Sequence, residues 1–172
     1  MDNVIIRKTA KEDLPRLLEV FATARSFMAR TGNPHQWAED YPSEALLNDD
    51  ISKGDSYVVI HDGRIVGTFV LRLGIDPTYK VIYEGNWIDD GPYATIHRIA
   101  SSGEIGGIFR RTVEFAQHEC GYGSIRIDTH KDNKVMQAAI EREGFVYCGI
   151  IRCWNGSERM AFQRCLNGKI VV

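Results

Sequence analysis

The chain contains 172 residues, of which 44% are hydrophobic and 26% are charged, and its formal net charge at pH 7 is -2. This composition excludes a disordered, collagen-like or coiled-coil protein, and the length suits one domain with a sizeable buried core over residues 1–172. The balance of 21 Lys and Arg against 23 Asp and Glu argues against nucleic acid or an anionic membrane as a partner.

No apolar run approaches the ~20 residues of a membrane span, and Asp2 stands where a secretory signal would carry basic residues. We therefore expect a cytoplasmic protein that does not bind membranes. Neither the cysteines nor the histidines show metal-ligand or redox spacing, so we predict no metal site and mostly buried, reduced thiols. The four cysteines are Cys120, Cys148, Cys153 and Cys165.

The first part of the chain predicts a strand, two helices and a β-hairpin. Its β-branched and apolar periodicities give strand Val4–Thr9, helix Lys11–Arg30, a short helix capped by Ser43 that runs to Ile51, and strands Ser56–His61 and Arg64–Leu73. The dipeptide Asp62-Gly63 between these two strands supplies the positive φ angles of a tight turn.

A long aromatic and acidic segment, residues 76–91, follows the hairpin, and loops of this length are uncommon unless they line a site or form a lid. Strand Tyr93–Ala100 comes next. Strict alternation along that strand would place His97 and Ile99 on one face of the sheet, with Arg98 and Ala100 on the other.

The last part of the chain alternates helices and strands before a second hairpin. The predicted elements are a helix from the glycine-containing break at Ser101–Gly107 to about Cys120, strand Ser124–Asp128, a helix from Asp132 or Asn133 to Gly144, and strands Phe145–Cys153 and Glu158–Leu166 across Asn155-Gly156. Strand-helix-strand units imply parallel strands, whereas hairpins imply antiparallel ones. We therefore predict an α/β (α+β) fold with a mixed, mostly antiparallel central sheet and helices on both faces.

Two stretches carry a family resemblance. The run Ser101-Ser102-Gly103-Glu104-Ile105-Gly106 aligns with the phosphate-binding signature Arg/Gln-x-x-Gly-x-Gly/Ala of the GNAT superfamily of N-acetyltransferases, although Ser101 and Glu104 depart from it. Asn133 at a helix start and Gly144-Phe145 at its end resemble a later motif of the same family. Independently of the name, a glycine-rich turn before a helix presents backbone N–H groups that suit a pyrophosphate.

The resemblance implies a GNAT-like acyl-CoA N-acyltransferase fold of a bacterial branch, with acetyl-CoA as cosubstrate and direct acetyl transfer to a primary amine of a small molecule or an amino terminus. It also implies that CoA contacts Ile99, Ala100, Ser101, Ser102, Gly103, Glu104, Ile105, Gly106, Gly107, Arg111 and Asn133. The alternative is a non-catalytic module that binds or senses CoA or acyl-CoA. That alternative is motivated by Glu104 and by Ile140, which stands where the family often has a tyrosine acid.

Three residues are candidates for proton transfer. His97 titrates near neutral pH and is the first candidate for a general base, against a structural histidine. Glu84 can deprotonate an ammonium group through water if it is buried, against a solvated loop acid. Tyr147 is a candidate replacement for the missing tyrosine acid, against a half-buried strand aromatic.

The candidate acceptor pocket is aromatic. Trp37, Tyr83 and Trp87, with Tyr41, can bind an amine cation or simply pack beneath long loops. Asp89-Asp90 and Glu39-Asp40 favour a cationic acceptor, against ordinary solvated acids. Arg110 and Arg111 can offset Glu104 or reach a phosphate, against a solvated helix face. A homodimer through Ile170-Val171-Val172 at a sheet edge is left open.

Overall fold

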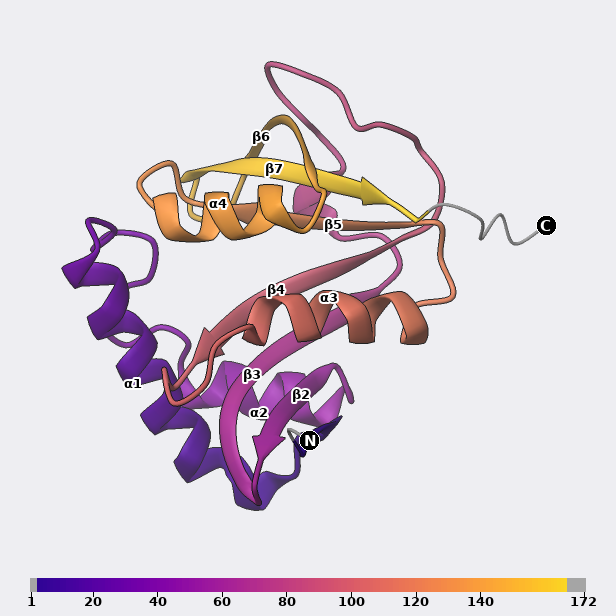
Figure 1. Ribbon diagram of the computed structural model, residues 1–172. Coiled ribbons are helices and arrows are strands. Elements are labelled where there is room, and N and C mark those ends of the chain that lie inside the picture. Colours follow the sequence, from indigo (N-terminus) through magenta and orange to yellow (C-terminus); the bar gives the residue numbers. More distant parts are fainter. Residues whose placement is uncertain (1–2, 167–172) are drawn as a thin grey trace.

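The computed structural model describes residues 3–166, and one seven-stranded sheet runs through them (Figure 1). The strands stand in the order β1-β2-β3-β4-β5-β7-β6, and only β4 and β5 are parallel neighbours. This confirms the predicted mixed, mostly antiparallel sheet. The strands are β1 Val4–Lys8, β2 Ser56–His61, β3 Arg64–Leu73, β4 Tyr93–Ser101, β5 Ser124–Thr129, β6 Val146–Arg152 and β7 Glu158–Cys165.

Helices cover both faces of the sheet, as predicted (Figure 1). They are α1 Leu14–Arg30, α2 Glu44–Ser52, α3 Ile108–Glu119 and α4 Lys134–Arg142, with short 3-10 turns η1 Lys11–Asp13 and η2 Pro77–Tyr79. The predicted start of the first helix at Lys11 is wrong by one turn. The α-helix begins later because Pro15, which has no N–H to donate, occupies its first turn.

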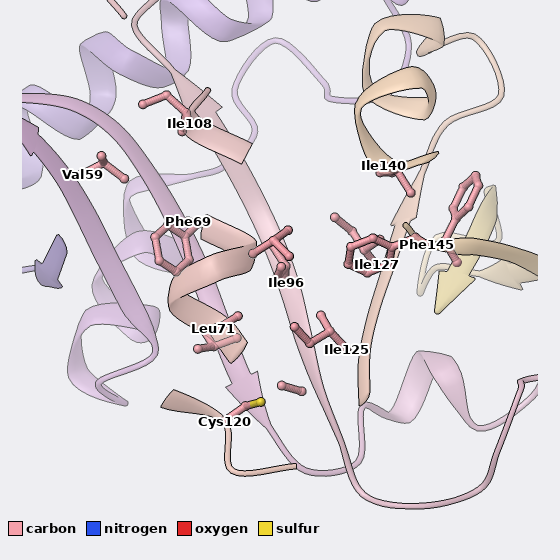
Figure 2. Close-up of a cluster of buried hydrophobic side chains, with 14 of the residues drawn as sticks. Val59, Phe69, Leu71, Ile96, Ile108, Cys120, Ile125, Ile127, Ile140 and Phe145 are labelled. Carbon is pink, nitrogen blue, oxygen red and sulfur yellow. The ribbon is translucent and has the colours of Figure 1, made fainter. Parts of the chain in front are cut away.

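Two apolar layers hold these helices against the sheet. The larger one joins the sheet to α3 and α4 and includes Phe69, Ile96, Ile127 and Ile140, which point toward one another in Figure 2. A smaller layer, with Leu17, Val20, Phe21 and Leu47, joins α1 and α2 to the other face. Ile140 is fully buried, so the position of the family's tyrosine acid is part of the core in this chain.

The segment between β3 and β4 reaches across to the far edge of the sheet. Tyr83 and Ile150 of β6 exchange two backbone hydrogen bonds of 2.8 Å, which form an isolated antiparallel bridge. The two backbone segments are in close contact at this bridge: a Cβ added to Gly149 would lie 2.5 Å from the Tyr83 carbonyl oxygen. The edge strand β6 is therefore covered at its midpoint.

In the described range, no helix combines the length and apolar character that crossing a bilayer requires. The four cysteines are unpaired: Cys120 and Cys148 are buried, Cys153 is half-buried and Cys165 is exposed. The segment Ile170–Val172, on which the homodimer alternative rests, lies outside the described residues.

Candidate functional site

Strands β4 and β5 are hydrogen-bonded to each other along only part of their length. They pair only between Tyr93–Thr95 and Ser124–Arg126, and beyond these residues the two strands separate, as the left half of β4 in Figure 1 shows. A cavity of about 1000 Å³ lies at this divergence. It is lined by the second half of β4, the glycine-containing loop 101–107, the end of α1, the start of α4 and the β6–β7 turn.

A β-bulge at Arg98 shapes the wall of the cavity. Thr68 pairs with Ala100 but Val70 pairs with His97, so β4 carries one extra residue, and Arg98 adopts a left-handed backbone with φ 48°. The predicted strict alternation is therefore wrong beyond His97. Ile99 packs with the α3–α4 layer that contains Ile96, whereas Ala100 packs with the α1–α2 layer.

The side chain of Arg98 anchors this bulge to α2. Its guanidinium donates two hydrogen bonds, of 2.6 and 2.9 Å, to the carboxylate of Asp50, which is fully buried. Arg72 lies 3.6 Å from the same carboxylate. Burial alone would lower the pKa of Arg98, but Tyr41 and Asp50 raise it above its ordinary value. Arg98 thus stays charged in the wall of the cavity.

His97 and Asp76 form a hydrogen-bonded pair in the cavity wall. Nε2 of His97 lies 2.7 Å from Oδ2 of Asp76, which is 3% exposed, and Asp76 also accepts hydrogen bonds from the Thr78 backbone and hydroxyl. Burial would raise the pKa of Asp76, but the hydrogen bond and charge of His97 and the Thr78 bonds hold it below its ordinary value. Asp76 is therefore an anion that fixes the orientation of the His97 ring.

A second hydrogen-bonded pair lies beside the first. The Tyr79 hydroxyl donates a 2.6 Å hydrogen bond to Asp128, and the Tyr79 ring lies 5.9 Å from the His97 ring. Burial and the charge of Asp128 raise the pKa of Tyr79 well above its ordinary value. Both acids that line the cavity, Asp76 and Asp128, therefore already accept hydrogen bonds from the protein.

The loop 101–107 presents backbone to the cavity. Gly107 precedes α3 in a left-handed conformation with φ 76° and provides no side-chain cap, so the first N–H groups of α3 have no helical partner. Gly106 has neither a positive φ nor a neighbouring atom within 4 Å of a Cβ added to it. The fold itself does not require glycine at position 106, but a ligand that approaches the loop backbone would.

The charge of Glu104 is directed away from the cavity. Its carboxylate lies 2.5 Å from the Arg16 guanidinium of α1 and 3.8 Å from that of Arg64. The sequence suggested Arg110 or Arg111 as the partner, but Arg110 pairs with Glu114 on its own helix at 2.9 Å. Glu104 and Arg111 are the only predicted CoA contacts in the described chain that do not line the cavity; Ile99–Gly103, Ile105–Gly107 and Asn133 all line it.

Asn133 joins two walls of the cavity. Its Oδ1 accepts the Met136 N–H and caps α4, while its Nδ2 donates a 2.8 Å hydrogen bond to Gln36 in the α1–α2 connection. The same Gln36 oxygen accepts a 2.9 Å hydrogen bond from Asn33. The sequence predicted the cap but not the link to Gln36, because the two residues are 97 positions apart.

Several predicted site residues lie away from the cavity. Glu84 follows the Tyr83 bridge and is exposed. The ring of Tyr147 packs against the ring of Phe162, its cross-strand neighbour on β7. Tyr83 covers the Arg152 guanidinium, and Trp87 covers that of Arg126 at 4.1 Å. None of these four residues lines the cavity, nor do Glu39, Asp40, Asp89 and Asp90. Most of these residues belong to the loop 76–91, which crosses to the β6 edge of the sheet. They therefore lie outside the cavity that His97 lines.

The aromatic wall of the cavity is built from other residues. Trp37 and Tyr41 line it as expected and lie 5.9 Å apart, and Phe27 of α1 and Trp154 of the β6–β7 turn complete it. Trp154 is 85% exposed. Sequence reasoning missed Trp154 and also Asp76, Asp128 and Arg159. The position of Trp154 in the turn of the second hairpin was the available signal.

No protein-family model and no curated protein matches the chain. Among solved structures, an acetyltransferase of the GNAT family from Streptococcus agalactiae is 30% identical, with 95% of this chain and 96% of that chain covered and a TM-score of 0.86. One of the same family from Listeria monocytogenes is 20% identical, with 95% of each chain covered and a TM-score of 0.70. The ribosomal-protein-alanine N-acetyltransferase from Brucella melitensis is 16% identical, with 94% and 99% covered and a TM-score of 0.59. These last two likenesses concern the fold alone.

Proposed function

Because the chain belongs to the GNAT family of acetyltransferases, we propose that it transfers an acetyl group from acetyl-CoA to the primary amine of a small molecule or an amino terminus. The observation that carries this proposal is the continuity of one cavity, which runs from the glycine-containing loop past the bulge of β4 to His97. A glycine-containing loop suited to a pyrophosphate, an unpaired strand edge and an imidazole thus line the same space.

The residues present fit CoA. The loop backbone before α3 and the uncapped first turn of that helix suit the pyrophosphate, and Gly106 leaves room for its close approach. Beyond Thr95, the edge of β4 that faces β5 has no strand partner, so backbone groups of Ile99–Ser101 are available to the pantetheine arm and the acetyl carbonyl. Arg16 and Arg64 form ion pairs with Glu104, so the charge of Glu104 does not repel a phosphate at this loop.

Acetyl-CoA would supply an activated acetyl group and a thiol leaving group. Overall, one amide C–N bond forms, one thioester C–S bond breaks, and one amine proton passes to the sulfur. His97 would accept the proton of the ammonium group. Since Asp76 holds Nε2 of His97, Nδ1 is the ring nitrogen that remains to take the proton. Direct attack by the amine then needs no covalent intermediate on the protein.

Thermal unfolding with acetyl-CoA, CoA and ATP in parallel tests the cofactor, since a ligand selective for the folded state stabilises it by about 2.7 kcal/mol at a hundred times its dissociation constant. Release of free thiol with a panel of amines tests the chemistry. His97→Ala should lower kcat by roughly 100-fold to 10,000-fold without changing CoA binding. His118→Ala, at an exposed position of α3, is the matched control and should leave kcat unchanged.

Stabilisation by ATP but not by CoA would refute the proposal. CoA binding without thiol release from any amine would favour the non-catalytic CoA-binding module instead, for which the buried Ile140 at the family's acid position is the specific observation.

A further inference from the structure

Arg159 of β7 is a buried cation in the wall of the cavity and has no acidic partner within the described part of the chain. It is 8% exposed, and its guanidinium donates to the Ser157 hydroxyl at 3.1 Å and to the backbone oxygens of Glu158 and Gln36 at 3.0 Å. All three acceptors are neutral. Across residues 3–166, no carboxylate oxygen lies within 4.0 Å of this guanidinium, whereas Arg98 and Arg72 in the same wall both face Asp50.

A buried guanidinium without a counter-charge is costly unless an anion completes it. Arginine has five N–H donors in a planar fork, of which three are used here by the protein. The two that are left can bind a carboxylate or a phosphate through two parallel hydrogen bonds. Arg159 is therefore equipped to bind an anionic group that enters the cavity.

The groups expected to favour a cationic acceptor are not available to it. Asp89, Asp90, Glu39 and Asp40 lie off the cavity. The two acids that do line it, Asp76 and Asp128, are already hydrogen-bonded to His97 and Tyr79. The Arg159 guanidinium, in contrast, contacts only neutral acceptors among residues 3–166.

Arg159 lines the same cavity as the proposed base. His97 stands on β4 and Arg159 on β7, on either side of β5, in the part of the sheet where β4 and β5 have separated around the cavity. Cys153 also lines the cavity: burial, Asp128 and Asp76 raise the pKa of its thiol, and the Arg159 cation lowers it. Arg159, Asp76 and Cys153 therefore share one cavity with His97.

We propose that the acceptor is a molecule of amino-acid type, whose carboxylate binds Arg159 while its amine lies at His97. This inference rests on the proposed function and narrows its substrate class. Arg159 would be a specificity-determining residue, since it holds the acceptor by a group that does not react. Trp37, Tyr41 and Trp154 line the same cavity, so an apolar or aromatic side chain fits beside the carboxylate.

The test measures binding rather than turnover. Isothermal titration of the unaltered protein, saturated with CoA, with the twenty common amino acids and their amides should find at least one acid that binds 10-fold or more tightly than its amide. Arg159→Gln should abolish this difference, and Arg159→Lys should retain part of it. Arg152→Gln, at an exposed arginine of β6, is the matched control and should leave the difference intact.

Equal binding of acid and amide, or no binding of any amino acid, would overturn the inference. The comparison on the unaltered protein decides this even if Arg159→Gln misfolds. Failure of the proposed function would look different, because thiol release would then be absent with every amine while the preference for the carboxylate persisted.

Discussion

Replacing Arg98 by methionine tests how the bulge of β4 is held. The substitution keeps the bulk of the side chain and the left-handed backbone of position 98 but leaves the Asp50 carboxylate buried without its two hydrogen bonds of 2.6 and 2.9 Å. Breaking a buried pair in this way typically costs about 3–5 kcal/mol. Arg72, at 3.6 Å from Asp50, compensates in part, so we expect a loss near the lower end, about 3 kcal/mol.

For a chain of this length, that loss corresponds to a fall of about 6–12 °C in the midpoint of thermal unfolding. Urea denaturation at pH 7, followed by tryptophan fluorescence and far-ultraviolet circular dichroism, measures it directly. The double substitution Arg98→Met with Asp50→Leu should be more stable than Arg98→Met alone, because no unpaired charge is then buried. Arg110→Met, which breaks an exposed pair on α3, is the control and should leave the midpoint unchanged.

A loss below about 1 kcal/mol for Arg98→Met would refute this reasoning, since it would mean that Asp50 is solvated or fully served by Arg72. A double variant that is less stable than either single one would also contradict it. In that case the energy would come from packing of the aliphatic stems and not from the buried charges.

Three further predictions concern Asp76, Gly106 and Gly149. The lowered pKa of Asp76 stabilises the folded chain above the ordinary aspartate value of about 3.9, and this contribution is lost as the pH falls toward the folded value. The stability advantage over Asp76→Asn should therefore be present at pH 5 and shrink below pH 4, and a difference in urea titrations that stays flat from pH 5 to pH 3 would contradict it. Gly106→Val should leave the unfolding midpoint unchanged but weaken CoA binding at least 10-fold in calorimetry, and equal affinity would show that the ligand does not approach this loop. Gly149→Ala, whose Cβ would lie 2.5 Å from the Tyr83 carbonyl oxygen, should cost about 1–3 kcal/mol and expose residues 76–91 to proteolysis; an unchanged cleavage rate would argue against the bridge.

Local signals predicted the fold well. Asp62-Gly63 and Asn155-Gly156 marked both hairpin turns, Ser43 and Asn133 marked two helix caps, and the alternating order of elements implied the mixed sheet. Each of these signals acts within a few residues of the chain, which is why the sequence alone displays it.

The errors in the site arise from contacts over long sequence separations. The local sequence around Arg98 does not predict a bulge, because the left-handed residue is not a glycine and its ion-pair partner, Asp50, is 48 positions away. Glu104 finds Arg16 across 88 positions for the same reason. The cavity therefore contains the predicted loop and His97. Its acids, its buried arginine and half of its aromatic wall come from segments that are far apart in the sequence and are brought together by the strand order of the sheet.

The bridge between Tyr83 and Ile150 also bears on self-association. An uncovered edge strand offers a row of free peptide groups that can template the addition of a strand from another molecule. At β6 this row is interrupted at Ile150, where both peptide groups are taken by Tyr83. A strand from another molecule could pair with β6 at this point only after displacing the segment around Tyr83. The bridge therefore protects the β6 edge from intermolecular strand addition and aggregation.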